Sequence, residues 1–231
     1  MSLSTVLSVS VHPPKVRAYE DGIRRLAARA QQQRDAYQWR AQQVVAGQQG
    51  VIHFVSQADD FAALAARDAT PQALVLRLLG EKEGTKLLDE LLACTQSSRY
   101  TIARERPDLS YPPDRRTQTS PFSVVTLIRV RPGHQDAGEE LIRKIAEAIP
   151  KVDDPARVVA FQTVIGDLRT YWTVRPIESL ADLDRHLPPV ELLNKAFGAA
   201  EGGLIARAGL ESFEHVERSI SMLRSDLSNP S

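Results

Sequence analysis

The sequence predicts an α+β fold in which two tandem βαββαβ repeats pack their antiparallel sheets into one barrel within the chain. When the chain is shifted against itself by 119 residues, Val11–Leu64 aligns with Val130–Leu183 without a gap, and by direct count 15 of these 54 positions are identical. Ordinary residue usage would give about three or four identities. The phrases "RPDLSYP" (Arg106–Pro112) and "RSDLSNP" (Arg224–Pro230) match at five of seven positions. Both halves also show the same order of strand and helix patterns.

Alternating and helical spacing of apolar residues predicts the elements of the first half. These are strand Val6–Val11, a helix with the apolar stripe Ile23, Leu26, Ala27 and Ala30, strands Gln42–Ala46 and Val51–Val55, helical sequence from Asp59 that includes "LLDELLACT", and strand Tyr100–Arg106. A prolyl pair follows the first strand, and Gly47 supplies the turn between the second and third strands.

The second half repeats this order. Its elements are strand Val124–Val130, a helix with the stripe Ala137, Leu141, Ile142, Ile145, Ala146 and Ile149 that Pro150 ends, strands Phe161–Ile165 and Thr170–Val174, a helix capped by Ser179, helical sequence "LIARAGLESF" broken at "EGG", and strand Ser219–Arg224. Strand, helix, strand, strand, helix, strand is the ferredoxin-like order. Because helices cover only one face of such a sheet, we expect the two uncovered faces to pack together as an eight-stranded barrel.

The repeat length divides the chain into residues 1–110, a linker over 111–121 and residues 122–231. The linker is rich in Pro, Ser, Thr and charged residues and has no apolar period. We interpret the shared "DLS" motif as a structural stop after the last strand of each repeat. Its Asp and Ser side chains are of the kind that satisfy nearby backbone donors through Asx-type turns.

Composition excludes several classes of protein. The 29 Lys and Arg residues balance 29 Asp and Glu residues, so the basic excess that a nucleic-acid-binding protein uses to neutralise phosphates is missing. Cys94 is the only cysteine, which excludes an intrachain disulfide and a cysteine cluster for zinc. No apolar run approaches the 18 or so residues needed to cross a membrane. We therefore expect a cytoplasmic protein that binds neither nucleic acid nor membrane and holds no metal.

The element order, with turn sequences such as "VVAGQQGVIHFV" and "TVIGDLRTYWTV", resembles the dimeric α+β barrel superfamily. That group includes antibiotic-biosynthesis-monooxygenase-like (ABM-like), NIPSNAP-like, haem-degrading and chlorite-dismutase-like proteins. The resemblance covers nearly the whole chain twice, and it implies that a tandem fusion replaces the usual homodimer. It supports the fold far more than an activity, because the matching motifs are structural.

Three residues are candidates for lining a ligand pocket: His53, Trp172 and His186. His53 lies in the middle of a predicted buried strand, where a histidine serves as a base or, more commonly, as a satisfied core residue. The resemblance implies that Trp172 and His186 correspond to the tryptophan and iron-ligating histidine of haem-degrading members. The asparagine of those enzymes is absent from the first strands, so haem is not favoured. The alternative for His186 is an exposed histidine at a helix end.

The cofactor-free members hold a polyphenol in a pocket of Trp, Asn, Tyr and Arg, and one strand here carries Tyr171, Trp172 and Arg175. Tyr171 and Trp172 cannot line one pocket, because neighbours on a strand point to opposite faces. The halves also differ: Tyr37 and Trp39 stand where the second half has Ala156 and Val158. A site is therefore expected in one half only.

Two classes of function remain open at this stage. One is a cofactor-free or haem-using monooxygenase-like enzyme that acts on a small aromatic or apolar molecule. The alternative is a non-catalytic barrel that binds a small ligand or assembles with another copy, as a homodimer of fused barrels. The sequence does not decide whether the protein is an enzyme.

Overall fold

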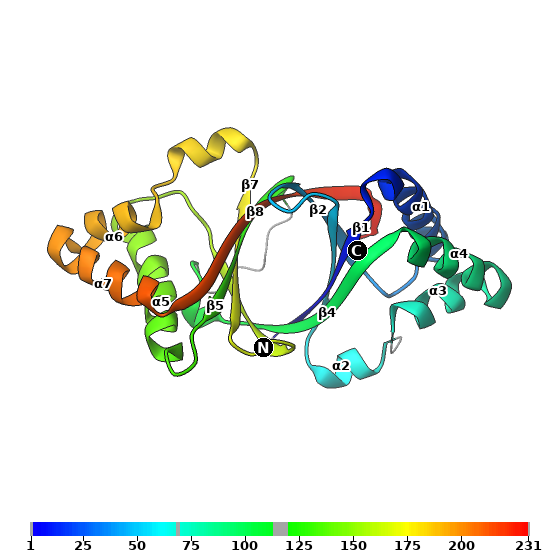
Figure 1. Cartoon of the computed structure of the whole chain (residues 1–231), viewed down its shortest axis with the longest axis horizontal. Helices are drawn as coiled ribbons and strands as arrows, with labels where there is room; N and C mark the ends of the chain where they lie inside the picture. Colours follow the sequence, from blue (N-terminus) through cyan, green and yellow to red (C-terminus); the bar gives the residue numbers. More distant parts are fainter. Residues whose placement is uncertain (1, 68–69, 113–119, 231) are drawn as a thin grey trace. The chain divides into compact units, whose positions relative to one another are not determined.

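The computed structural model describes residues 2–67, 70–112 and 120–230 (Figure 1). The first half contains β1 (Leu3–Val11), α1 (Val16–Gln33), β2 (Trp39–Ala46), β3 (Val51–Ala58), α2 (Phe61–Ala65), α3 (Pro71–Leu79), α4 (Glu81–Cys94) and β4 (Thr95–Glu105). The second contains β5 (Phe122–Val130), α5 (Gln135–Lys151), β6 (Val159–Ile165), β7 (Thr170–Ile177), α6 (Pro189–Phe197), α7 (Ala199–Glu211) and β8 (Phe213–Asn229). Short 3₁₀ helices cover Pro13–Lys15, Pro107–Leu109 and Leu180–Arg185.

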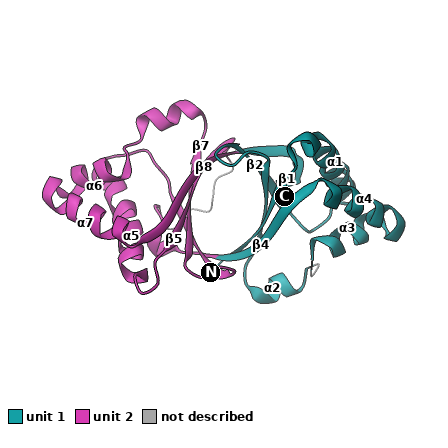
Figure 2. Cartoon of the chain, in the orientation of Figure 1, with its two compact units in different colours: residues 1–103, 222–231 teal, residues 104–221 magenta. Residues whose placement is uncertain are grey.

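The eight strands hydrogen-bond in the order β1-β3-β2-β8-β5-β7-β6-β4, and the order closes on itself as a barrel. This confirms the predicted fold class. The chain divides into two compact units, residues 1–103 with 222–231 (unit 1) and residues 104–221 (unit 2). Figure 2 shows that β8 changes unit along its length. The last strand of the first half, β4, therefore ends in unit 2, and the last strand of the second half, β8, ends in unit 1.

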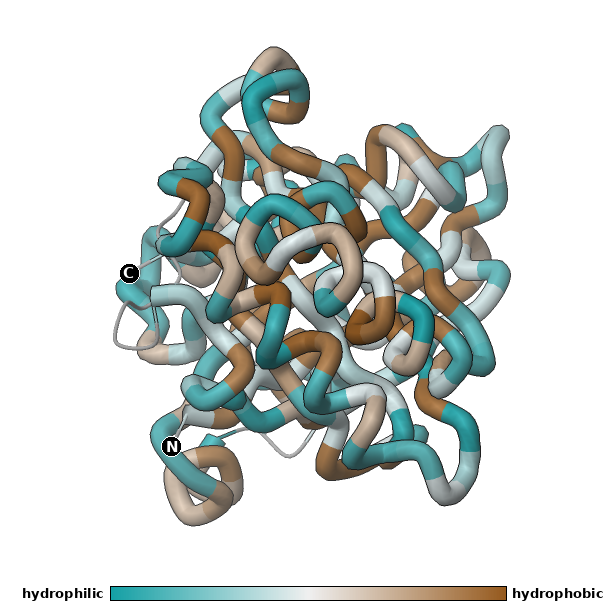
Figure 3. Tube along the Cα trace, turned by 90° about the vertical axis from the view of Figure 1, so that its left-hand side faces the viewer, coloured by the Kyte–Doolittle hydropathy of each residue, from teal (hydrophilic) through white to brown (hydrophobic). Residues whose placement is uncertain are grey.

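In unit 1, β3 pairs antiparallel with β1 and β2. Helix α1 packs its predicted stripe inward, and all four stripe residues are buried. The stripe contributes to two apolar clusters, one with Ile52 of β3 and one with Leu74 and Leu78 of α3. Apolar and polar segments alternate along the helices in Figure 3, as expected for helices that cover one face of a sheet.

In unit 2, β7 pairs antiparallel with β5 and β6, and α5 packs against the sheet. Helix α5 runs one residue beyond Pro150, which lies in its last turn. The expected break at "EGG" is wrong, because Glu201–Gly203 lie inside α7. Gly202 is needed there for packing: a Cβ at that position would come within 2.6 Å of the Leu193 carbonyl carbon and oxygen of α6.

The motif "RPDLSYP" is bound by the second half of the chain, within unit 2. The Arg106 guanidinium donates to Glu139 (3.0 and 2.8 Å), to Asp108 (2.9 and 2.7 Å) and to Gln162 (2.7 Å). We call these four residues the Arg106 cluster. Ser110 Oγ donates to the Arg106 carbonyl and accepts from the backbone N–H of Ala160. The paired charges lower the pKa of Glu139 and Asp108 below their usual values.

The motif "RSDLSNP" forms the matching Arg224 cluster in unit 1, made of Arg224, Asp226, Glu20 and Gln43. Arg224 donates to Glu20 (2.8 and 3.1 Å), to Asp226 (2.9 and 2.8 Å) and to Gln43 (2.5 Å). Hydrogen bonds from Arg224, aided by Arg24, lower the pKa of Asp226 to about 2. The two clusters are made of residues that are identical between the halves. The motif that ends the first half binds residues of the second half, and the motif that ends the second half binds residues of the first half.

These clusters revise the interpretation of the "DLS" motif. Its aspartates pair mainly with an arginine two residues earlier, and its serines bind a neighbouring strand. The motif is also not a stop in the second half, because β8 continues through it to Asn229. β8 begins at Phe213, six residues before the predicted start, because pairing with β5 and β2 extends it through a polar segment.

Candidate functional site

His53 lies on β3 of unit 1, beside the first strand. Its Nδ1 is 2.8 Å from the Oγ of Ser8, the residue opposite it on β1. The preceding residue, Ile52, belongs to the core cluster with Tyr19 and Ile23 of α1. Because successive side chains of a strand alternate, His53 points to the face that α1 does not cover.

Trp172 holds the corresponding place on β7 of unit 2, between Leu127 of β5 and Phe161 of β6. Its neighbour Tyr171 is buried against Ile142 of α5, so Trp172 also points away from the helices. The Trp172 Nε1 atom is buried, and no described residue accepts a hydrogen bond from it.

His186 follows the 3₁₀ helix of unit 2 and is held by an aspartate. Its side chain is 8 % exposed and that of Asp154 is 3 % exposed, with Nδ1 and Oδ1 2.9 Å apart. The expectation of an exposed histidine at a helix end is therefore wrong for the side chain. Asp154 also accepts from the backbone N–H groups of Ala156 (2.8 Å) and Leu187 (3.1 Å). Burial raises the pKa of Asp154, but these hydrogen bonds, led by that of His186, outweigh it and lower the pKa overall.

An ionised Asp154 fixes the tautomer of His186. The carboxylate accepts from Nδ1–H, so the neutral ring carries its lone pair on Nε2. This is the arrangement that prepares an imidazole to accept a proton or to coordinate a metal. Among the described residues no group of three or more His, Cys, Asp and Glu side chains could hold a metal ion.

The three predicted pocket residues do not meet at one place. His186 lies in the helical layer of unit 2, where the next residue, Leu187, packs with Leu192 and Leu193 of α6. Trp172 lies on the opposite face of the same sheet, and His53 belongs to unit 1. Of the three residues, His186 alone lies in the helix-covered layer, where it forms a polar pair with Asp154.

Arg175, two strand positions beyond Thr173, completes the polar groups of this layer. It shares the helix-covered face of β7 with Tyr171, and the register places it opposite Val124 on β5. Continuing the β6 register places it opposite Val158, which is buried with Ala156. Burial, and then the nearby Arg218 guanidinium, lower the pKa of Arg175, and the Asp154 carboxylate offsets them only in part.

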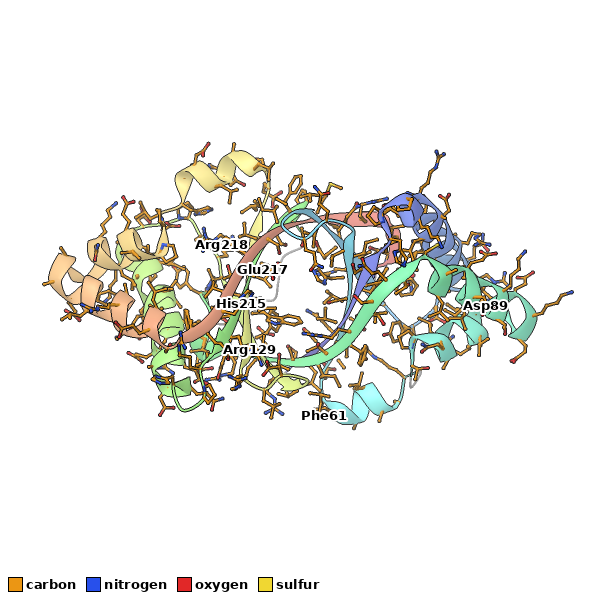
Figure 4. All side chains as sticks on the ribbon, viewed as in Figure 1. Phe61, Asp89, Arg129, His215, Glu217 and Arg218 are labelled. Carbon is orange, nitrogen blue, oxygen red and sulfur yellow. The ribbon has the colours of Figure 1, made fainter. Side chains whose placement is uncertain are left out.

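Arg218 comes from β8, the strand beside β5. Its Nε lies 3.4 Å from the Thr126 hydroxyl of β5. Figure 4 shows Arg218 on the other side of β8 from His215 and Glu217, in agreement with strand alternation. Arg175 and Arg218 thus lie on the same layer of unit 2 as the His186–Asp154 pair.

The corresponding layer of unit 1 is filled by side chains that satisfy one another. Tyr37 stands in the place of Ala156, and its hydroxyl lies near Ser56 and Thr5, the counterparts of Arg175 and Val124. Arg67, the counterpart of His186, donates to the Ser56 hydroxyl at 2.8 Å and lies over the Tyr37 ring at 5.7 Å. The two halves therefore differ at this position. In unit 1, Tyr37 contacts Arg67, which binds Ser56, whereas unit 2 has the small side chain of Ala156 in the place of Tyr37.

A shallow surface depression in unit 2 is lined by Arg131, Pro132, His134, Arg169 and Glu214. Its charges already have partners: Arg169 donates to Glu214 at 2.7 Å and to the Val130 carbonyl at 3.0 Å. It is separate from the His186–Asp154 pair. Across the described helices, none is long and apolar enough to span a membrane.

Comparison with solved structures places this architecture among α+β barrels. The chain resembles a protein named as a monooxygenase from Lactobacillus acidophilus NCFM, with a TM-score of 0.57, 5 % identity and coverage of 99 % of this chain and 97 % of that one. It resembles an anthrone oxidase-like protein (TM-score 0.56, 15 % identity, 100 % and 94 % covered). It also resembles chlorite dismutase from Candidatus Nitrospira defluvii, solved with imidazole (TM-score 0.55, 9 % identity, 97 % and 92 % covered).

These similarities establish the fold, a closed eight-stranded α+β barrel formed by a single chain. At such low identity they assign no activity. No protein-family model and no curated protein matches the sequence.

Proposed function

We propose that the protein is a monooxygenase-like enzyme that acts on a small aromatic or apolar molecule at the helix-covered layer of unit 2. The observation that carries the proposal is the buried His186–Asp154 pair, whose Nε2 is left available. The three structural neighbours are named for oxygen chemistry or chlorite chemistry, which supports the same reaction class. Apolar residues of α5 and α6 around the pair would exclude water from a bound ring.

In the cofactor-free form of this proposal, His186 is the general base. Nε2 takes a proton from an acidic C–H or O–H of the substrate, and the Asp154 carboxylate stabilises the imidazolium that forms. The resulting anion reacts with O₂, which is the oxidant. Applied to anthrone, the balanced overall reaction is anthrone + O₂ → anthraquinone + H₂O. A positioned general base of this kind contributes about 10²–10⁴-fold to the rate.

The haem-using form of the proposal makes a different use of the same pair. A histidine whose Nδ1–H is bound by a carboxylate would suit ligation of haem iron through Nε2. Bound haem would supply the oxygen or chlorite chemistry, and this chain would supply His186 as ligand and Asp154 to set the basicity of that ligand. The absence of the asparagine from the first strands still disfavours haem over the cofactor-free form.

Oxygen consumption with anthrone as the probe tests the proposal. The variant His186→Ala should lower kcat/KM at least tenfold, and His186→Gln should do the same, because neither residue can accept the proton. The matched control is His215→Ala, since His215 lies on β8 with 55 % of its side chain exposed. A parallel reconstitution with haem should give a Soret band only if the haem form is correct. Equal turnover by the wild type and both His186 variants would reject His186 as the base.

The alternative function is a non-catalytic barrel that binds a small ligand or assembles as a homodimer of fused barrels. The observation that favours it is the separation of His53, Trp172 and His186 onto different faces and units, which leaves few groups to perform a reaction. A protein that binds aromatic probes but shows no oxygen consumption with any of them supports this alternative.

We also propose that the chain arose by tandem duplication of an ABM-like or NIPSNAP-like unit, with repeats at 1–110 and 122–231 joined by 111–121. Residues 113–119 of that linker lie outside the described residues. Support comes from the Arg106 and Arg224 clusters, which repeat the same bonds with residues 118 or 119 positions apart. We retain the cytoplasm as the proposed location, with neither nucleic acid nor membrane as a partner.

A further inference from the structure

The surface depression of unit 2 is lined by two arginines that come from different segments of the chain. Arg131 follows the end of β5, and Arg169 precedes the start of β7. Pro132 and His134 line the same depression, with Glu214 of β8 as its acidic member. The lining is therefore positively charged overall and has little apolar surface, which suits a small anion better than an aromatic ring.

Arg131 is held in place by the end of α7. Its backbone N–H donates to the Ser212 carbonyl at 2.8 Å, and its Nε donates to the Glu211 carbonyl at 3.1 Å. No acidic side chain in the described part of the chain forms an ion pair with Arg131, and its two Nη atoms have no acceptor there. Because Nε already fixes the side chain, the two Nη atoms can bind a ligand with little further loss of side-chain entropy.

Arg169 is fixed at the neighbouring strand end. The Val130 N–H donates to the Arg169 carbonyl at 3.0 Å, and Arg169 Nη1 donates to the Val130 carbonyl at 3.0 Å. Nη1 also donates to Glu214 at 2.7 Å, and this bond lowers the pKa of Glu214 below its usual value. Glu214 thus offsets the charge of Arg169 and leaves that of Arg131 uncompensated. The depression keeps a net positive charge.

The equivalent place in unit 1 lacks this pair of arginines. Lys15 there donates through Nζ to the Ala93 carbonyl at 2.6 Å, which satisfies the end of α4 as Arg131 satisfies the end of α7. An ammonium is a compact, strongly hydrated charge, whereas a guanidinium that uses Nε still presents two nitrogens in a fixed plane. Gly50 stands in the place of Arg169. We therefore expect one site per chain, in unit 2.

We infer that this depression binds a phosphate group through Arg131 and Arg169, with His134 as a further donor. Each guanidinium matches two oxygens of a phosphate, and a tetrahedral group offers oxygens to both arginines, which a planar carboxylate does less well. Because the net charge of the lining is positive, a phosphate dianion is attracted more strongly than a monoanion. The ligand is inorganic phosphate or the phosphate end of a small molecule whose remainder stays in solvent. The inference goes beyond the proposed function, because the depression is separate from the His186–Asp154 pair.

Isothermal titration calorimetry on the full chain, in a phosphate-free buffer of low ionic strength, tests the inference. Inorganic phosphate should bind with a stoichiometry of one per chain, and acetate should bind at least tenfold more weakly. Glycerol phosphate distinguishes the two sources of the group: tighter binding than that of inorganic phosphate indicates a phosphorylated molecule, and equal or weaker binding indicates the free ion. No saturable binding of either probe, equal binding of acetate, or two sites per chain would overturn the inference.

Three variants locate the site. Arg131→Gln should weaken phosphate binding about tenfold or more, because hydrogen bonds to a charged group are lost. Glu214→Gln should tighten binding about three- to tenfold, because it removes the opposing charge and releases Arg169, and loss of fold could not produce this gain. The control Arg207→Gln should bind as the wild type does, since Arg207 is 80 % exposed on α7. Unchanged binding by Arg131→Gln, or no gain by Glu214→Gln, would refute the assignment.

Thermal melting separates binding from folding. Without phosphate, Arg131→Gln should melt within about a few degrees of the wild type, because the side chain is exposed. Phosphate should raise the melting temperature of the wild type and leave that of Arg131→Gln nearly unchanged. A rise of equal size in both proteins would count against the site. Turnover that depends on His186 without any phosphate binding would end this inference alone, whereas phosphate binding with full turnover by His186→Ala would end the proposed function alone.

Discussion

The Arg106 and Arg224 clusters predict unequal losses of stability when each arginine is replaced by methionine. Each arginine is largely buried, with 20 % and 15 % of its side chain exposed, and each neutralises one partly buried glutamate. Removing one partner of a buried ion pair costs about 3–5 kcal/mol, because the remaining charge is left uncompensated. The difference between the clusters lies in what remains afterwards.

In unit 1, Arg24 remains 2.9 Å from Glu20 and 2.8 Å from Asp226, so we expect Arg224→Met to cost about 2 kcal/mol, below the usual range. In unit 2, the matching residue Arg143 pairs with Glu140 instead. After Arg106→Met, the Tyr171 hydroxyl, at 2.5 Å, is the one hydrogen-bond donor to the Glu139 carboxylate that remains among the described residues. We therefore expect Arg106→Met to cost about 3–4 kcal/mol.

Urea denaturation followed by tryptophan fluorescence measures both values, since each unit contains one tryptophan. Trp172→Phe leaves Trp39 to report unit 1, and Trp39→Phe leaves Trp172 to report unit 2. The control is the double variant Arg106→Met with Glu139→Gln, which removes the stranded charge and should recover at least half of the loss. The reasoning is refuted if Arg224→Met costs as much as Arg106→Met, or if Glu139→Gln recovers nothing.

Two further predictions follow from local structure. The pKa of Asp226 is lowered to about 2. The ionised Asp226 therefore stabilises the fold fully above the ordinary pKa near 3.8, and this stabilisation is lost as the pH falls towards 2. In a plot of melting temperature against pH, Asp226→Asn should reduce the fall in melting temperature between these two pH values, and an unchanged fall would contradict this. Gly202→Ala should cost about 1–3 kcal/mol through its clash with Leu193, whereas at Gly203 the nearest atom is 4.0 Å away and Ala should be neutral or stabilising in the same thermal melt. Equal effects at the two glycines would contradict the packing argument.

The order of elements was predictable from the sequence because the periodicity of apolar residues records which face of each element is buried. The stripe from Ile23 to Ala30 is one example, and all its members are buried. Element ends were less predictable. Local pattern favoured a start of the last strand at Ser219, but pairing with two other strands extends β8 from Phe213. Glu201–Gly203 read as a helix break for a similar reason, because the packing of Gly202 against α6 is invisible in one sequence.

The candidate site was less predictable than the fold. His186 was identified from its order after Trp172, but its partner Asp154 lies 32 residues earlier and no local pattern links them. One signal did exist: Asp35 and Asp154 are identical between the halves, and both accept a backbone N–H two residues later. The sequence places Arg175 on one strand with Tyr171 and Trp172. Its position near Arg218 depends on three strands, β7, β5 and β8, that meet only in the folded chain.

The exchange of last strands between the units has a consequence for synthesis on the ribosome. Residues 222–231 belong to unit 1, whose other residues lie within the first 103. Unit 1 can acquire Arg224 and Ser228 only when the codons for residues 222–231 have been translated, whereas every residue of unit 2 has been synthesised by position 221. Unit 1, most of which is made first, is therefore completed after unit 2, and until then the edge of its sheet at β2 lacks its partner strand β8.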